Sequence, residues 1–135
     1  MKVYSLEKGE RERIKHLIAE FLMNRDDVIF AYLHGSFLSG APFRDIDVAV
    51  YTGKKHDVFY ELGLEEELER LTGFPVDVRV LNDAPISFRF SVLKGELLFS
   101  KDEEKRCEFE ERTLREYHDF SYHLNMYRRE ALGMS

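Results

Sequence analysis

Branched aliphatic residues occupy every second position of residues 46–50, and this pattern constrains the fold more than any other feature of the chain. Ile46, Val48 and Val50 alternate with Asp45 and Asp47, and a two-residue period is that of a β-strand. The two aspartates therefore share one face of the strand, where their like charges repel each other. A divalent cation relieves this repulsion, and Mg²⁺ prefers oxygen ligands such as one or two carboxylates and substrate phosphates. The pattern thus predicts a strand that carries a metal site.

A glycine and a serine stand where the preceding apolar segment ends. Residues 28–33 form an apolar run of strand length, Gly35 and Ser36 follow it, and Gly40 helps to turn the chain toward the two aspartates. Glycine lets the backbone approach a ligand closely, while the serine hydroxyl and the N–H groups of the turn can bind an anion. We therefore expect Gly35 and Ser36 to cradle phosphate groups.

A third acidic residue lies on another strand pattern. Valines occupy every second position of residues 76–80, so Asp77 and Arg79 point to the opposite face. If this strand lies beside the strand with Asp45 and Asp47, directly opposed Cβ atoms are roughly 5 Å apart and Asp77 reaches the same metal site. Each feature alone has a simpler interpretation, because Gly-Ser turns are common and Asp77 can pair with Arg79. Their combination on apolar strands favours a metal and nucleotide site.

Hydrophobic periodicity predicts an α/β fold with a mixed β-sheet flanked by helices and a long C-terminal helix. The predicted helices cover residues 7–24, 56–71, 86–93 and 102–131, and the predicted strands cover 27–34, 45–51, a segment around Asp77, and 96–99. In the helix at 56–71 the expected apolar face consists of Phe59, Leu62, Leu68 and Leu71. A length of 135 residues with 44% hydrophobic residues fits a single domain over residues 1–135.

Composition argues against several classes of function. The net charge of −6 argues against a general nucleic-acid surface, which needs an excess of basic residues. No segment has the roughly 20 apolar residues of a membrane span, and the first residues do not resemble a signal peptide, so we expect a cytoplasmic protein. Cys107 is the only cysteine, which rules out an internal disulfide and a thiolate zinc cluster.

The combination of motifs resembles a known family. Gly35 and Ser36, the pair Asp45 and Asp47, and the later Asp77 look like the signature of the DNA polymerase β-type nucleotidyltransferase superfamily. The short length and the long last helix resemble, more specifically, the minimal nucleotidyltransferases of the MntA type, which are antitoxins paired with HEPN-domain ribonucleases called HepT. The resemblance covers nearly the whole chain, although the segment between Ser36 and Asp45 is shorter than in many members.

The resemblance implies a Mg²⁺-dependent transfer of AMP from ATP to a tyrosine hydroxyl of a HepT-type toxin. The phosphates of ATP would lie at Gly35 and Ser36. Asp45 and Asp47 would hold two Mg²⁺ ions, while Asp77 would complete the ion nearer the acceptor and help to deprotonate the attacking hydroxyl. Arg44 is a further candidate contact for the triphosphate.

The residues leave other functions open. A binding antitoxin with a vestigial metal site fits the same chain, and so does a nucleotidyltransferase that acts on a small-molecule hydroxyl. A two-metal hydrolase fits less well, because no residue identifies an attacking water. The predicted domain leaves no room for a separate acceptor-binding domain, which favours an acceptor that brings its own recognition surface.

Two further features have both a structural and a functional interpretation. His34 precedes the Gly-Ser turn and either contacts a nucleotide or packs at the end of its strand. The last helix has more aromatic residues than one buried stripe needs, including Phe120 and Tyr122. They either pack within the chain or form part of an interface with a partner.

Overall fold

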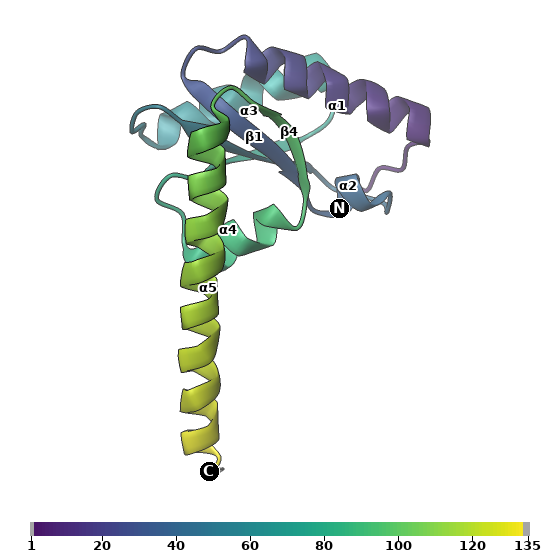
Figure 1. The fold of residues 1–135 in the computed structure, drawn as a ribbon. Coiled ribbons are helices and arrows are strands. Elements are labelled where there is room, and N and C mark those ends of the chain that lie inside the picture. Colours follow the sequence, from purple (N-terminus) through teal and green to yellow (C-terminus); the bar gives the residue numbers. More distant parts are fainter. Residues whose placement is uncertain (1, 134–135) are drawn as a thin grey trace.

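The protein contains one four-stranded β-sheet with helices on both faces, as described by a computed structural model for residues 2–133 (Figure 1). The strands are β1 (Val28–His34), β2 (Ile46–Thr52), β3 (Val76–Val80) and β4 (Glu96–Ser100). They lie in the order β3, β2, β1, β4. Strand β1 is antiparallel to β2 and β4, whereas β2 and β3 are parallel. The predicted mixed sheet is therefore confirmed.

The helices are α1 (Lys8–Met23), α2 (Ser36–Ser39), α3 (Val58–Thr72), α4 (Ile86–Leu93) and α5 (Glu103–Ala131). Every helix and strand predicted from periodicity is present, with ends that agree to within two residues. Two details differ. The one-turn helix α2 was not predicted, because four residues are too few for a helical period. Asp45 lies immediately before β2 instead of inside it.

Helices α1 and α3 cover one face of the sheet. Ile14 and Ile18 of α1 are fully buried there, as is Leu68 of α3. The predicted apolar face of the helix at 56–71 is wrong in part, since Phe59, Leu62 and Leu71 are 73%, 51% and 42% exposed. The buried side of α3 follows the four-residue spacing Leu64, Leu68 and Thr72, so the surplus apolar residues near its start face solvent.

The other face of the sheet is covered only in part. Phe30, Ala49, Leu81 and Val92 form a second core here, together with Phe109 from the first half of α5. Helices α4 and α5 cover the end of the sheet at which these residues lie. Asp47 occupies the same face of β2 as Ala49, two residues earlier, and thus lies beyond this second core.

The long helix α5 has a buried half and a free half. Thr113 is fully buried and Tyr117 stacks on Phe90 with a centroid distance of 3.6 Å. Farther along, Tyr122 is 58% exposed and Tyr127 is 69% exposed, and the helix extends away from the rest of the molecule (Figure 1). Packing within the chain is therefore confirmed for the first half of the helix, whereas an interface with a partner stays a prediction for the exposed second half. In residues 2–133 no helix combines the length and the apolar character needed to cross a bilayer.

Candidate active site

The register of the sheet brings the predicted residues into one row. His34 at the end of β1 pairs with Asp47 on β2, and Asp47 pairs in turn with Asp77 on β3. The turn at Gly35 and Ser36 follows His34 directly. Since neighbouring strands lie about 4.8 Å apart, the row spans three strands at the part of the sheet that the second core leaves open. The predicted adjacency of the two acidic strands is confirmed.

Gly35 lies directly against the carboxylate of Asp47. A Cβ atom at Gly35 would be 2.1 Å from Asp47 Oδ2, which is far inside van der Waals contact. Gly35 also has φ +81° and ψ −167°, a conformation that is essentially restricted to glycine. This position therefore requires glycine for two independent reasons, the close approach to Asp47 and the backbone conformation. Together they keep the turn against the acidic residue.

Among residues 2–133, Arg79 compensates the negative charges at this site only in part. Burial, followed by the nearby carboxylates of Asp45 and Asp77, raises the pKa of Asp47 to about 7, against the opposing effect of Arg79. Burial also lowers the pKa of His34, and its Nε2 atom is buried without a hydrogen-bond partner in the part of the chain that is described. A carboxyl group with a raised pKa is typical of functional sites.

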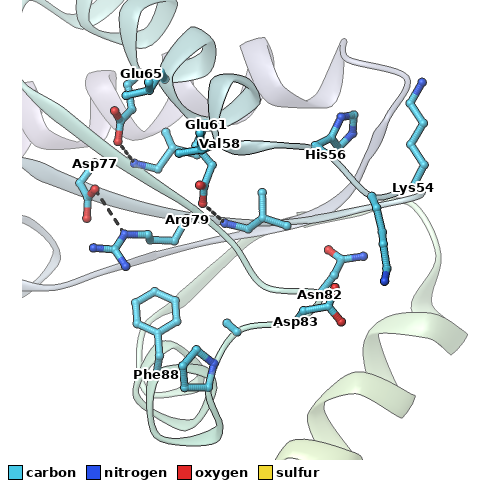
Figure 2. Close-up of a pocket in the computed structure, with 16 residues that line it drawn as sticks. Lys54, His56, Val58, Glu61, Glu65, Asp77, Arg79, Asn82, Asp83 and Phe88 are labelled. Carbon is cyan, nitrogen blue, oxygen red and sulfur yellow. Dashed lines mark hydrogen bonds and ion pairs between the residues drawn. The ribbon is translucent and has the colours of Figure 1, made fainter.

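The three acidic residues do not form a complete metal site in this structure. The Asp77 carboxylate pairs with its neighbour Arg79, with Oδ1 3.6 Å from Nε (Figure 2). Among residues 2–133 no group of three or more His, Cys, Asp or Glu side chains is placed to hold a metal ion. A nearby positive charge such as that of Arg79 stabilises the ionised form of a carboxylate in such a cluster. Their role as metal ligands stays a prediction.

The donor set nevertheless suits a divalent cation. Asp45 and Asp47 lie near each other, and the pKa of Asp47 is raised by burial and then by the negative charges of Asp45 and Asp77, both of which a bound cation would offset. One or two carboxylates are sufficient for Mg²⁺ when substrate phosphates supply further ligands. Asp77 can join them by releasing Arg79, since that pair is exposed enough to be weak.

The chain around Ser36 is held by a residue that sequence reasoning missed. Arg11 of α1 donates from Nη1 to the carbonyl of Phe37 and from Nη2 to the carbonyl of Gly40, both at 2.8 Å. Ser36 itself is exposed and begins α2. The signal that could have revealed Arg11 is its spacing, because it lies three residues before Ile14 and therefore on the buried stripe of α1.

A groove of about 650 Å³ runs along the outer edge of β3. We call it the β3 groove, and its lining residues include Lys54, Leu62, Glu65, Asp77, Arg79 and Phe88 (Figure 2). It lies between α3, β3 and α4, and Asp77 belongs both to the groove and to the row of site residues. The site thus opens into a space large enough for a substrate group.

The outer edge of β3 is closed to another strand. The backbone N–H groups of Val76, Val78 and Val80 donate to the carboxylates of Glu69, Glu65 and Glu61, at 3.1, 2.8 and 2.9 Å. Figure 2 shows the two bonds to Glu65 and Glu61. These glutamates are spaced four residues apart on α3, so they form one row beside the strand. A molecule that enters the β3 groove therefore cannot add a β-strand through these N–H groups.

Two candidate residues from the sequence are not brought into firm contact. Arg44 is exposed and forms no ion pair or side-chain hydrogen bond among residues 2–133. His34 lies in the row, and its ring meets Phe88 edge-on with a centroid distance of 5.6 Å. The packing interpretation of His34 thus accounts for the ring, while the free Nε2 atom leaves a ligand contact open.

Comparison with known proteins places this geometry in context. The chain matches the family described as "Polymerase beta, Nucleotidyltransferase" over residues 16–104. No curated protein matches it. Among solved structures, a complex of a tri-AMPylated HEPN toxin with an MNT antitoxin from Shewanella oneidensis contains a similar chain, with 20% identity and a TM-score of 0.73. The similarity covers 90% of this chain and 98% of that chain.

Two further solved structures show the same fold. A toxin-antitoxin complex of MntA with HepT has a chain with 19% identity and a TM-score of 0.67, covering 93% of this chain and 99% of that one. A toxin-antitoxin structure with AMP-PNP has a chain with 20% identity and a TM-score of 0.69, covering 94% and 99%. At these identities the comparisons establish the fold, and the predicted nucleotidyltransferase-like architecture is confirmed.

Proposed function

Because this chain belongs to the polymerase β family of nucleotidyltransferases, we propose that it transfers AMP from ATP to a tyrosine hydroxyl of a HEPN-domain toxin in the cytoplasm and thereby acts as an antitoxin. The observation that carries the proposal is the contact between Gly35 and Asp47, which joins a candidate phosphate turn to a half-buried carboxylate. The similar folds come from toxin-antitoxin structures, one of them with an AMPylated toxin and one with AMP-PNP, and these support the choice of nucleotide and acceptor.

The nucleotide would lie with its β- and γ-phosphates at Gly35 and Ser36. The turn exposes backbone N–H groups and the Ser36 hydroxyl, which are suitable donors to phosphate oxygens. Asp45, Asp47 and Asp77 would hold two Mg²⁺ ions, which supply positive charge that polarises the α-phosphate and compensates the charge of the leaving pyrophosphate. Asp77 must separate from Arg79 before it can bind an ion in this arrangement.

The reaction joins the acceptor oxygen to the α-phosphorus. The hydroxyl proton passes to the Asp77 carboxylate as the oxygen attacks. The bond between the α-phosphorus and the bridging oxygen of pyrophosphate then breaks, which leaves an AMP ester and free pyrophosphate. Attacking and leaving oxygens lie roughly in line on opposite sides of the phosphorus, so acceptor and pyrophosphate must occupy opposite ends of the site.

The sheet order supplies these two ends. Ser36 follows β1, Asp47 lies on β2, Asp77 lies on β3, and the β3 groove lies beyond. With pyrophosphate at Ser36, the acceptor approaches through the β3 groove. Val58, which lines the groove, is 60% exposed, and the adjacent Phe59 is 73% exposed, so a protein acceptor has apolar surface to cover here.

Modification would silence the toxin electrostatically. Addition of AMP places a negatively charged phosphate and a bulky nucleoside on the tyrosine. Near a ribonuclease site this group repels the RNA backbone and excludes it sterically. The proposal therefore explains neutralisation by a covalent change, without a requirement that the antitoxin stay bound.

The test is co-expression of this chain with the HEPN-domain protein encoded beside it, followed by intact mass measurement of that partner. Wild type should add AMP-sized increments, and Asp47→Asn should add none. Asp26→Asn is the matched control. Asp26 is exposed in the turn before β1, so its substitution removes the same charge away from the site. Equal modification by wild type and Asp47→Asn would contradict the catalytic proposal.

A non-catalytic antitoxin is the second candidate function. The free half of α5, with Tyr122 and Tyr127 exposed, offers a surface for stable binding. The same experiment separates the two functions. An unmodified toxin that copurifies with wild type and with Asp47→Asn alike would favour neutralisation by binding. Transfer to a small-molecule hydroxyl in the β3 groove is the outcome to test if no toxin is modified or bound.

A further inference from the structure

We propose that Arg11 is a positioning residue that holds the Ser36 turn in the conformation that binds the nucleotide triphosphate. This inference rests on the proposed function and adds a residue outside the predicted site. Arg11 lies on α1, and its side chain is 9% exposed. Its guanidinium donates to the carbonyls of Leu6, Phe37 and Gly40 at 2.8 Å, and to that of Ala41 at 3.4 Å.

The one-turn helix α2 needs such a partner. The last four carbonyl groups of any α-helix lack i+4 partners within the helix, and α2 contains only four residues, Ser36–Ser39. Its local bonds are few: the Phe37 carbonyl accepts from the Gly40 N–H at 3.4 Å, and the Ser36 carbonyl accepts from the Ser39 hydroxyl at 3.0 Å. Gly40 then takes φ +85° and ends the turn. The planar guanidinium of Arg11 presents several N–H groups in a fixed arrangement, so one side chain binds the carbonyls of Phe37, Gly40 and Ala41 together. The position of Ser36 at the other end of α2 therefore depends on Arg11.

The charge of Arg11 is not neutralised by the chain. None of the ion pairs in residues 2–133 includes it, and all its hydrogen-bond acceptors are neutral carbonyls. Phe37 and Phe43 flank the guanidinium, with ring centroids 5.8 and 5.9 Å from Cζ. A buried cation without an anionic partner is costly. A triphosphate bound at Ser36 would offset this cost, because it brings negative charge to the other side of the same one-turn helix.

A second buried arginine provides the contrast. Arg89 of α4 is also 9% exposed, and its Nε donates to the carbonyl of Ala84, five residues earlier, at 3.0 Å. The Nε of Arg11 donates in the same way to Leu6, also five residues earlier. Arg89, however, pairs with the carboxylate of Glu116 and joins α4 to α5. The two residues are equally buried, but only Arg89 has an anionic partner inside the chain.

The experiment compares Arg11→Lys and Arg11→Met with Arg89→Lys as the matched control. The affinities of ATP with Mg²⁺ and of adenosine are measured by titration without an acceptor protein, and thermal unfolding verifies that each variant is folded at the assay temperature. Arg11→Lys keeps the charge but loses the planar arrangement of donors, and should weaken ATP binding about tenfold, the scale of one charge-assisted hydrogen bond. Arg11→Met should weaken it further. Adenosine binding should not change, because adenosine has no phosphate.

Arg89→Lys should lose about as much thermal stability as Arg11→Lys does, but it should bind ATP with the affinity of wild type. A purely structural role for Arg11 would lower stability in both lysine variants and leave the ratio of ATP to adenosine affinity unchanged, and that result would overturn the inference. Wild type that binds no ATP would instead refute the proposed function itself. The two failures are therefore distinguishable.

A measurement on wild type covers the case in which the Arg11 variants do not fold. Hydrogen exchange of the amides in residues 36–41 is followed with ATP and Mg²⁺ and with adenosine. If Arg11 couples this turn to the phosphates, ATP should slow exchange across the segment and adenosine should not. Equal exchange under both conditions would overturn the inference without any substitution.

Discussion

Replacement of Gly35 by alanine tests the geometry of the site most directly. The new Cβ atom would lie 2.1 Å from Asp47 Oδ2, whereas real Cβ contacts essentially never fall below 3.0 Å. The Asp47 carboxylate or the turn must therefore move by nearly 1 Å, and a displacement of about 1 Å at a reacting group can reduce a rate about 100-fold. The backbone conformation at Gly35 adds strain of about 1 to 3 kcal/mol. We expect loss of both stability and AMP transfer.

Gly73→Ala is the control for strain without displacement. Gly73 has φ +82° at the end of α3 and no atom within 4 Å of an added Cβ, so its replacement should cost about 1 to 2 kcal/mol of stability and leave transfer unchanged. The assays are thermal unfolding and the initial rate of transfer to the toxin.

A double-mutant comparison isolates the steric term. In an Asp47→Ala background the steric contact with the carboxylate is gone. Gly35→Ala should then cost only the free energy of its backbone strain, which is a smaller loss of stability than in wild type. Two results would refute the reasoning. One is a Gly35→Ala enzyme that transfers AMP at the rate of Gly73→Ala, and the other is an equal stability loss for Gly35→Ala with and without the Asp47 carboxylate.

Two further predictions concern the unliganded protein. The pKa of Asp47 is raised from its ordinary value of 3.8 to about 7, so its contribution favours the folded state below about pH 4 and is lost as the pH rises through 7. Thermal unfolding without Mg²⁺ should therefore show a fall in stability between about pH 4 and 7 that is smaller in Asp47→Asn, and an equal fall in both proteins would contradict the assignment. Glu65→Ala should cost about 1 to 3 kcal/mol, because it leaves the N–H of Val78 without its acceptor. Chemical denaturation should show no such loss for Glu66→Ala, whose exposed carboxylate pairs only with Arg70, and an equally small loss for both would show that the edge bond to Glu65 is weak.

Periodicity was a sufficient guide to the longer elements. The two-residue alternation at 46–50 and 76–80 gave strands whose side chains face as expected, and parallel pairing of β2 with β3 set Asp47 opposite Asp77. Prediction from periodicity failed where distant parts of the chain determine which residues a side chain contacts. Phe59 and Leu62 of α3 fit a helical stripe but face solvent, because the sheet packs against the side of α3 that carries Leu64 and Leu68.

The sequence by itself determined which chemical groups the site can use and on which face of each strand they lie, because the pleat of a strand depends only on neighbouring residues. Only the tertiary structure decided how those groups meet. Register across three strands placed Gly35 against Asp47, an ion pair turned Asp77 toward Arg79, and the packing of α1 brought Arg11 to the carbonyls beyond Ser36. These contacts join residues far apart in the chain, and their geometry depends on how the helices pack on the sheet, which no local pattern encodes.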